Sequence, residues 1–147
     1  MMTAVLNRPV ISTGSEGRRP DRELIREFLA LLWPEEPLPG RIAICDRDRD
    51  GEFRGAGFCS TVAEAADLAA DCAVTSCVWM SVGLLRPDLT SGRGCVNDVV
   101  ALPGIWCEID YGKPEGPPDI ETALVIAASL PLRPTLIVHT GHRIHCY

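Results

Sequence analysis

A strict alternation of apolar and polar residues runs through residues 104–110, whose sequence is GIWCEID. Successive side chains of a β-strand point to opposite faces, so this pattern predicts a strand with one buried face. The apolar face carries Ile105, Cys107 and Ile109. The other face carries Trp106, Glu108 and Asp110.

Residues 143–147, with the sequence RIHCY, alternate in the same way and predict a second strand. Its apolar face holds Ile144 and Cys146, and its polar face holds Arg143, His145 and Tyr147. If the two strands pair with their apolar faces matched, His145 shares the open face with the two acids of the first strand.

The remaining patterns predict a mixture of helices and strands. Asp21, Thr61 and Asp119 each precede a helical pattern and can cap it. The helices are expected over 21–32, 61–73 and 119–130. Further strands are expected over 41–46, 77–85 and 134–139. This mixture predicts the α/β (α+β) class, as a single mixed or antiparallel sheet with helices on one face.

The length of 147 residues fits one domain with a substantial core. Residues 1–20 are rich in Ser, Gly, Arg and Pro, and we expect them to form a flexible leader before a domain at 21–147. No apolar run reaches the ~18 residues that a membrane span needs, and no signal peptide is recognised. We therefore expect a cytoplasmic protein that makes no membrane contact.

Charge and cysteine content narrow the function classes. The net charge of −6 argues against a protein held on nucleic acid by bulk charge alone, although a local basic groove is compatible with it. The basic residues are thirteen arginines and one lysine, and arginine suits bidentate phosphate contacts. Seven cysteines without a CxxC pair favour buried free thiols over disulfides or a zinc ribbon.

Glu108 and Asp110 are two residues apart on one strand face, which places their Cα atoms roughly 6.5–7 Å apart. Both carboxylates can then reach one or two divalent cations, and hard oxygen ligands favour Mg²⁺ or Mn²⁺. Gly112 and the prolines after it end the strand there, where functional sites tend to collect. The alternative is a pair of ordinary acids on a solvated sheet face.

Three further alternatives concern other candidate ligands. An imidazole at His145 beside metal carboxylates can hold a phosphate oxygen, or it can be a histidine satisfied by hydrogen bonds within a sheet. A zinc site is a second alternative, from His139, His142 and His145. The segment DRDRDGEFRG, residues 46–55, reads as a charged turn, with a calcium site as the alternative.

The segments ALPGIWCEIDYGK and PTLIVHTGHRIHCY resemble the first two motifs of the archaeo-eukaryotic primase superfamily, in particular the primase–polymerase domains of phages, plasmids and integrated elements. The first motif is an acid–hydrophobic–acid triplet, here Glu108-Ile109-Asp110. The second is a glycine turn leading to a histidine, here Thr140-Gly141 leading to His145. The SGRG loop around Arg93 has a weaker likeness. The resemblance covers residues 77–147.

The resemblance implies an RRM-like core that performs two-metal nucleotidyl transfer in DNA replication, as a DNA primase or DNA polymerase. It implies that Glu108 and Asp110 bind Mg²⁺ or Mn²⁺ and that His145 contacts the triphosphate. The nucleotide-binding set would also include Thr140, Gly141, Arg143 and Arg93. The implied partners are nucleoside triphosphates and a DNA template with its primer.

The family pattern has a third acidic motif, which we expect beyond Tyr147. We therefore expect the chain to be the N-terminal part of a primase–polymerase, possessing little synthetic activity alone, with a helicase domain as a candidate downstream neighbour. Two residues depart from the family pattern. Glu108 replaces the more usual aspartate of the first motif. Arg143 occupies a position where the family prefers a small residue, and its side chain could either bind phosphate or block the nucleotide. The competing functions are a non-catalytic replication-initiator or nucleic-acid-binding domain and a metal-dependent nuclease or phosphohydrolase.

Overall fold

A computed structural model describes residues 20–47, 51–141 and 143–147. The described residues fall into two compact units, an N-terminal unit up to Pro103 and a C-terminal unit from Gly104. Residues 1–19 of the expected leader lie outside the described ranges. No helix within those ranges is long and apolar enough to cross a membrane.

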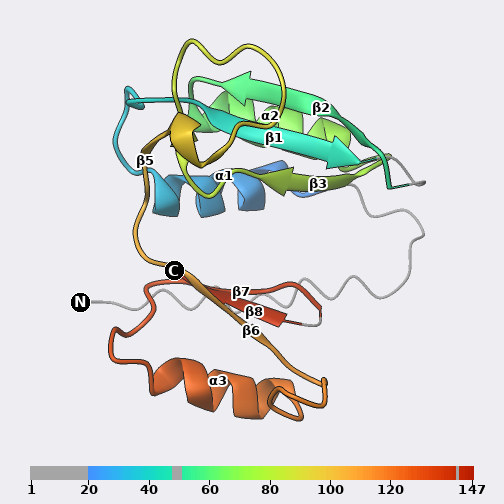
Figure 1. The fold of residues 1–147 in the computed structure, drawn as a ribbon, viewed down its shortest axis with the longest axis vertical. Coiled ribbons are helices and arrows are strands. Elements are labelled where there is room, and N and C mark those ends of the chain that lie inside the picture. The colour runs from blue at the N-terminus through green and yellow to red at the C-terminus, as the bar shows by residue number, and fades with distance from the viewer. Residues whose placement is uncertain (1–19, 48–50, 142) are drawn as a thin grey trace. The chain divides into compact units, whose positions relative to one another are not determined.

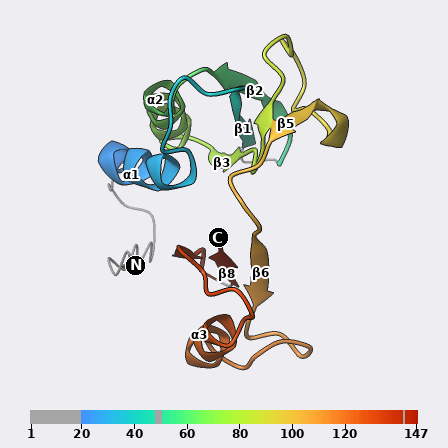
Figure 2. The same cartoon turned by 90° about the vertical axis from the view of Figure 1, so that its left-hand side faces the viewer.

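The N-terminal unit packs two helices against one face of a three-stranded antiparallel sheet of order β2-β1-β3 (Figures 1 and 2). A second sheet pairs β4 with β5. The elements in chain order are α1 (Arg22–Leu32), β1 (Ile42–Arg47), β2 (Phe53–Cys59), α2 (Val62–Cys72), β3 (Cys77–Met80), β4 (Leu84–Leu85), the 3₁₀ helix η1 (Val96–Asp98) and β5 (Val99–Ala101).

The helix starts predicted from the capping residues are confirmed. The Asp21 carboxylate accepts a hydrogen bond from the backbone N–H of Leu24 at 3.1 Å. The Thr61 hydroxyl accepts from the N–H of Glu64, also at 3.1 Å. The Glu64 carboxylate reaches back to the N–H of Ser60 at 2.8 Å, one residue before the cap. The first two contacts each satisfy a backbone donor that the first helical turn leaves unpaired.

The α+β class is confirmed, whereas the expectation of a single sheet is wrong. The strands of the described residues fall into three antiparallel sheets. The prediction of one buried strand over 77–85 is wrong, because none of the β3 residues is buried and only β4 is. The predicted strand divides into β3 and β4 at Ser81. The Ser81 hydroxyl accepts from Ala43 N at 3.0 Å while its N–H donates to Ala43 O at 2.9 Å. The sequence did not predict β2, whose glycines weaken a strand pattern, or the short β5.

The C-terminal unit is a three-stranded antiparallel sheet of order β6-β8-β7 with one helix on its apolar face (Figures 1 and 2). Its elements are β6 (Cys107–Asp110), α3 (Ile120–Ala128), β7 (Ile137–His139) and β8 (Arg143–Cys146). Ala123 and Ala127 of α3 pack against Ile144 and Cys146 of β8. Small alanines let the helix approach the sheet closely. The described residues of the C-terminal unit supply no second helix for the opposite face of this sheet.

The predicted apolar faces of the two strands are confirmed apart from one residue. Cys107 and Ile109 pack against the buried cluster of α3 and β8. Ile105 was predicted to join them, but 80% of its surface is exposed. The reason is that β6 begins only at Cys107, so Ile105 precedes the strand and does not follow its alternation.

The seven cysteines are free thiols, but the expectation that most are buried is wrong. Only Cys59 and Cys146 are buried, and Cys77 and Cys95 are exposed. Burial raises the pKa of both buried thiols to about 11. At neutral pH these two side chains therefore remain protonated and act as small apolar groups.

Ile144 is fully buried beneath α3, and shortening it leaves a cavity in a small core. We expect Ile144→Ala to lower the free energy of unfolding by about 2–5 kcal/mol, measured by urea denaturation. Val125→Ala on the exposed side of α3 is the control, because 69% of the Val125 surface is open to solvent. Equal effects of the two substitutions would contradict the packing described.

Candidate functional site

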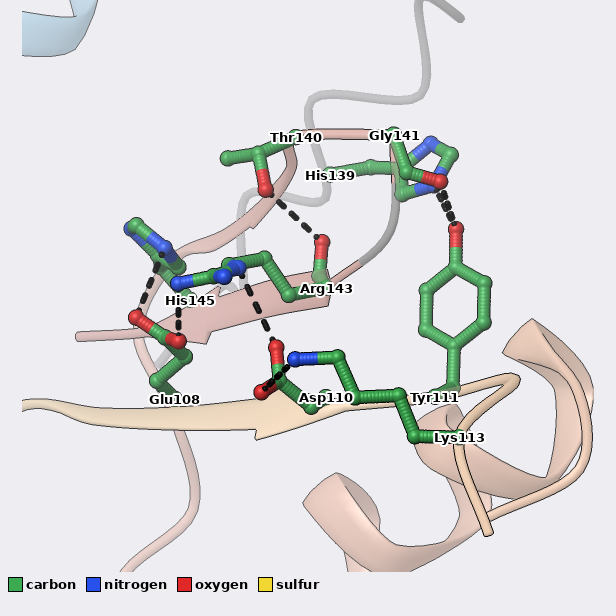
Figure 3. Close-up of polar contacts among 9 residues, drawn as sticks. All are labelled: Glu108, Asp110, Tyr111, Lys113, His139, Thr140, Gly141, Arg143 and His145. Atoms are coloured by element: carbon green, nitrogen blue, oxygen red, sulfur yellow. Dashed lines mark hydrogen bonds and ion pairs between the residues drawn. The ribbon is translucent and has the colours of Figure 1, made fainter. Parts of the chain in front are cut away.

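The register between β6 and β8 brings the predicted site residues together. Glu108 lies directly opposite His145, and Asp110 lies directly opposite Arg143. Residues directly opposite each other in an antiparallel pair project from the same face of the sheet. The prediction that His145 shares the open face with both acids is therefore confirmed. Figure 3 shows these four side chains together on that face.

Arg143 forms an ion pair with each of the two acids (Figure 3). Its Nη1 contacts Glu108 Oε1 at short range, and its Nε lies 3.1 Å from Asp110 Oδ1. The Arg143 side chain is 41% exposed, and the two acidic side chains are exposed by about a third. The guanidinium therefore links the two carboxylates from the solvent side of the sheet and balances part of their charge.

Lys113 supplies a second cation that the sequence analysis missed. Its Nζ lies 2.6 Å from Asp110 Oδ2. Gly112, with φ of +71°, turns the chain directly after β6, and its N–H donates to Pro117 O at 2.8 Å. This turn brings Lys113 back beside the strand end. The only signal for it in the sequence was a lone lysine three residues after an acid, followed by proline.

The two cations lower the pKa of Asp110 below its ordinary value of 3.8. The hydrogen bond from Lys113 is the largest cause, and the charge of Arg143 adds to it. Partial desolvation of the carboxyl acts in the opposite direction, but it is the weaker effect. Asp110 is therefore ionised at neutral pH, as a metal ligand must be.

His145 lies between two aromatic rings on the open face. Its ring centroid is 6.2 Å from that of Trp106 and 6.4 Å from that of Tyr147. Its Nε2 is 3.4 Å from Glu108 Oε2, close enough for an ion pair when the imidazole is protonated. Burial and the nearby Glu108 raise the pKa of Tyr147, so that its phenol stays neutral.

Within the described residues, two polar atoms of this face are shielded from solvent and make no hydrogen bond. They are Asp110 Oδ1 and His145 Nε2. Asp110 Oδ1 has the ion-pair contact with Arg143, and His145 Nε2 has the one with Glu108. The alternative that His145 is satisfied by hydrogen bonds within the sheet therefore does not hold for its Nε2 atom. A ligand or cation that contacts such a shielded atom supplies the partner that the atom lacks, and this contact favours binding.

The turn between β7 and β8 is fixed by its own polar contacts. Thr140 donates twice to the carbonyl of Arg143, from its N–H at 3.0 Å and from its hydroxyl at 3.1 Å. Gly141 has φ of +101°, a conformation that favours glycine. The Tyr111 hydroxyl donates to the Gly141 carbonyl and also contacts His139 Nε2 (Figure 3). Tyr111, which the sequence analysis did not select, thus ties this turn to the end of β6.

His139 and His145 do not form the zinc site that the sequence left as an alternative, because they lie on opposite faces of the sheet. His139 lies opposite Ile144 and so belongs to the apolar side, whereas His145 projects from the open face. His142 lies outside the described residues. The calcium alternative at 46–55 cannot be judged from the structure, because residues 48–50 also lie outside the described ranges.

The open face fits a hard divalent cation with few protein ligands. Within the described residues, no group of three or more His, Cys, Asp or Glu side chains could hold a metal ion. Mg²⁺, however, is usually bound by one or two carboxylates and completes its shell with waters and substrate phosphates. Glu108 and Asp110 meet that requirement, provided that the cation replaces the ion-pair contacts that Arg143 makes with both carboxylates.

Not every predicted nucleotide-binding residue gathers at this face. Thr140, Gly141, Arg143 and His145 belong to β8 and the turn before it. Arg93 belongs to the N-terminal unit, in the loop between β4 and η1, and its role stays a prediction.

The chain was compared with protein-family models, with curated proteins and with solved structures, and none of them matches it. The likeness to primase–polymerase domains therefore rests on the residues of the two sequence motifs alone.

The position of Lys113 and Arg143 predicts how Asp110 titrates. Because its pKa is lowered, the ionised Asp110 stabilises the fold above about pH 4, and this contribution is lost as the pH falls through the lowered value. Carboxyl ¹³C NMR should give a midpoint below 3.8. We expect Lys113→Met to raise that midpoint more than Arg143→Gln does.

Asp119 is the internal control for this titration, because its pKa is also lowered but by hydrogen bonds from Thr122. Its midpoint should not change in either variant. An Asp110 midpoint at or above 3.8 in the unmodified protein would contradict the described network.

Proposed function

We propose that the open face of β6 and β8 binds a nucleoside triphosphate with Mg²⁺ or Mn²⁺ and serves nucleotidyl transfer in DNA replication, as in a DNA primase or polymerase. The observation that carries the proposal is the register that sets Glu108 opposite His145 and Asp110 opposite Arg143. This pairing joins the acid triplet of the first motif to the histidine of the second on one face. It is the arrangement that the resemblance to primase–polymerases implies.

Each residue has a distinct part in the proposed chemistry. Glu108 and Asp110 hold the divalent cation, which when bound activates the attacking hydroxyl and neutralises charge on the triphosphate. The Nε2 of His145 makes no hydrogen bond to the part of the chain that the structure describes, and it donates to a phosphate oxygen when protonated. Trp106 and Tyr147 flank the imidazole and limit its orientations. Thr140 fixes the turn that leads into β8.

The described residues supply two of the three carboxylates that the family pattern uses. We therefore propose that this chain binds nucleotide by itself and that efficient synthesis requires a third acidic residue of the family pattern. The RRM-like core and the helicase neighbour are parts of the same proposal. Nucleotide binding is accordingly a better first test than synthesis.

A second candidate function is a non-catalytic nucleic-acid-binding domain. The observation that favours it is the charge balance of the open face, where Arg143 and Lys113 already compensate Glu108 and Asp110. A face balanced in this way is stable without metal. This candidate requires DNA binding that depends on neither divalent cation nor Asp110.

Substitution of Asp110 tests the proposal. Asp110→Ala should weaken Mn²⁺-dependent binding of a non-hydrolysable dATP analogue by about tenfold or more, because a direct metal ligand contributes at least as much as its supporting groups. Isothermal titration calorimetry measures the affinity with Mn²⁺ and with EDTA. Glu115→Ala is the matched control, since it removes one negative charge from the exposed loop after β6.

Unchanged metal-dependent binding in Asp110→Ala would rule out the proposed site. Binding of a labelled primer–template that is equal in EDTA and in the Asp110→Ala variant would instead support the nucleic-acid-binding candidate. The same labelled DNA, run on a denaturing gel after incubation with Mn²⁺ and deoxynucleoside triphosphates, identifies a nuclease by shortened products. Extended products would indicate polymerase activity.

A further inference from the structure

The position of Arg143 conflicts with simple metal binding at the two acids. Its Nη1 is paired with Glu108 and its Nε with Asp110, so the guanidinium links the carboxylates that the proposed cation would share. Two cations that use the same carboxylate oxygens repel each other. A divalent cation that contacts both acids must therefore take over contacts that Arg143 holds in the free protein.

The charges on this face indicate what happens to Arg143 afterwards. Glu108 and Asp110 carry two negative charges, and Arg143 and Lys113 carry two positive ones. A divalent cation added to this balanced group leaves an excess of positive charge. A triphosphate brings several negative charges, and an arginine released from a carboxylate binds phosphate oxygens with the same planar set of donors.

The structure leaves the Arg143 side chain free to make this exchange. The side chain is 41% exposed, and ion pairs at exposed sites are weak and easily replaced. The backbone of Arg143 is held instead, because Thr140 donates two hydrogen bonds to its carbonyl and β8 pairs with strands on both sides. The guanidinium can turn to a new partner while the strand stays in place.

We propose that Arg143 is an exchangeable counter-charge that couples metal binding to triphosphate binding. This inference rests on the proposed function and deepens it. In the free protein, Arg143 neutralises Glu108 and Asp110 and so disfavours the binding of a metal ion alone. When the metal and the triphosphate bind together, Arg143 leaves the carboxylates and pairs with the phosphates. The arginine thereby makes the site selective for the metal–nucleotide complex over either ligand alone.

The proposal predicts effects of opposite sign on two ligands. Arg143→Gln should tighten the binding of Mn²⁺ alone by about tenfold, because the competing cation is gone. The same substitution should weaken binding of a non-hydrolysable dATP analogue at saturating Mn²⁺ by about tenfold, because a phosphate contact is lost. Free Mn²⁺ is counted by electron paramagnetic resonance, and nucleotide affinity is measured by calorimetry. A purely structural arginine would affect both ligands in the same direction.

Two further variants make the test specific. Arg143→Lys keeps the charge and should return both affinities toward those of the unmodified protein, although less completely, because lysine lacks the planar fork. Arg22→Gln is the matched control, since Arg22 also pairs with two acids, Asp67 and Asp71, in the N-terminal unit. We expect both ligand affinities of Arg22→Gln to stay within about twofold of the unmodified protein.

The outcomes separate this inference from the function on which it rests. If the unmodified protein binds neither Mn²⁺ nor the analogue, both are overturned. If it binds both ligands, but Arg143→Gln leaves Mn²⁺ affinity unchanged or lowers it, only the exchange is overturned. A third outcome is that Arg143→Gln loses both affinities while Arg143→Lys retains them. This result would show that Arg143 supports the structure of the site, and it would also overturn the exchange.

Discussion

The antiparallel register of β6 and β8 is the constraint on which the candidate site depends. A shift of one residue would place Glu108 and Asp110 against the apolar side of β8 and turn His145 away from them. Packing prevents that shift, because Cys107 and Ile109 must meet Ile144 and Cys146 beneath α3. The apolar face therefore determines the chemistry of the polar face, although no atom of α3 need touch a ligand.

The charge network is the second determinant, and it changes the interpretation of the acid pair. By spacing alone, two carboxylates two residues apart fit either a metal site or a pair of ordinary acids on a solvated sheet face. With Arg143 across both and Lys113 on one, the same carboxylates form a balanced group in the free protein. A cation at these carboxylates would have to compete with the protein's own basic side chains. In the proposed function, the binding of metal, the binding of nucleotide and the position of Arg143 are therefore coupled.

The parts of the structure that local rules govern could be predicted from the sequence. The helix caps at Asp21, Thr61 and Asp119 were found because a capping side chain acts within three residues. The shared face of His145 and the acids followed from strand alternation and a matched apolar side. The contacts of Arg143, Lys113 and Tyr111 could not be found in this way, because each depends on register or on the path of a turn. The division into three sheets likewise depends on long-range pairing.

Paramagnetic broadening by Mn²⁺ tests the central claim most directly, because it locates the cation without requiring catalysis. The claim is that a divalent cation binds at Glu108 and Asp110 on the open face. At substoichiometric Mn²⁺ with a non-hydrolysable nucleotide, amide signals of residues 108–110 and 143–145 should broaden before those of the other described residues of the C-terminal unit. Broadening centred elsewhere, or spread evenly over the acidic surface, would contradict the account.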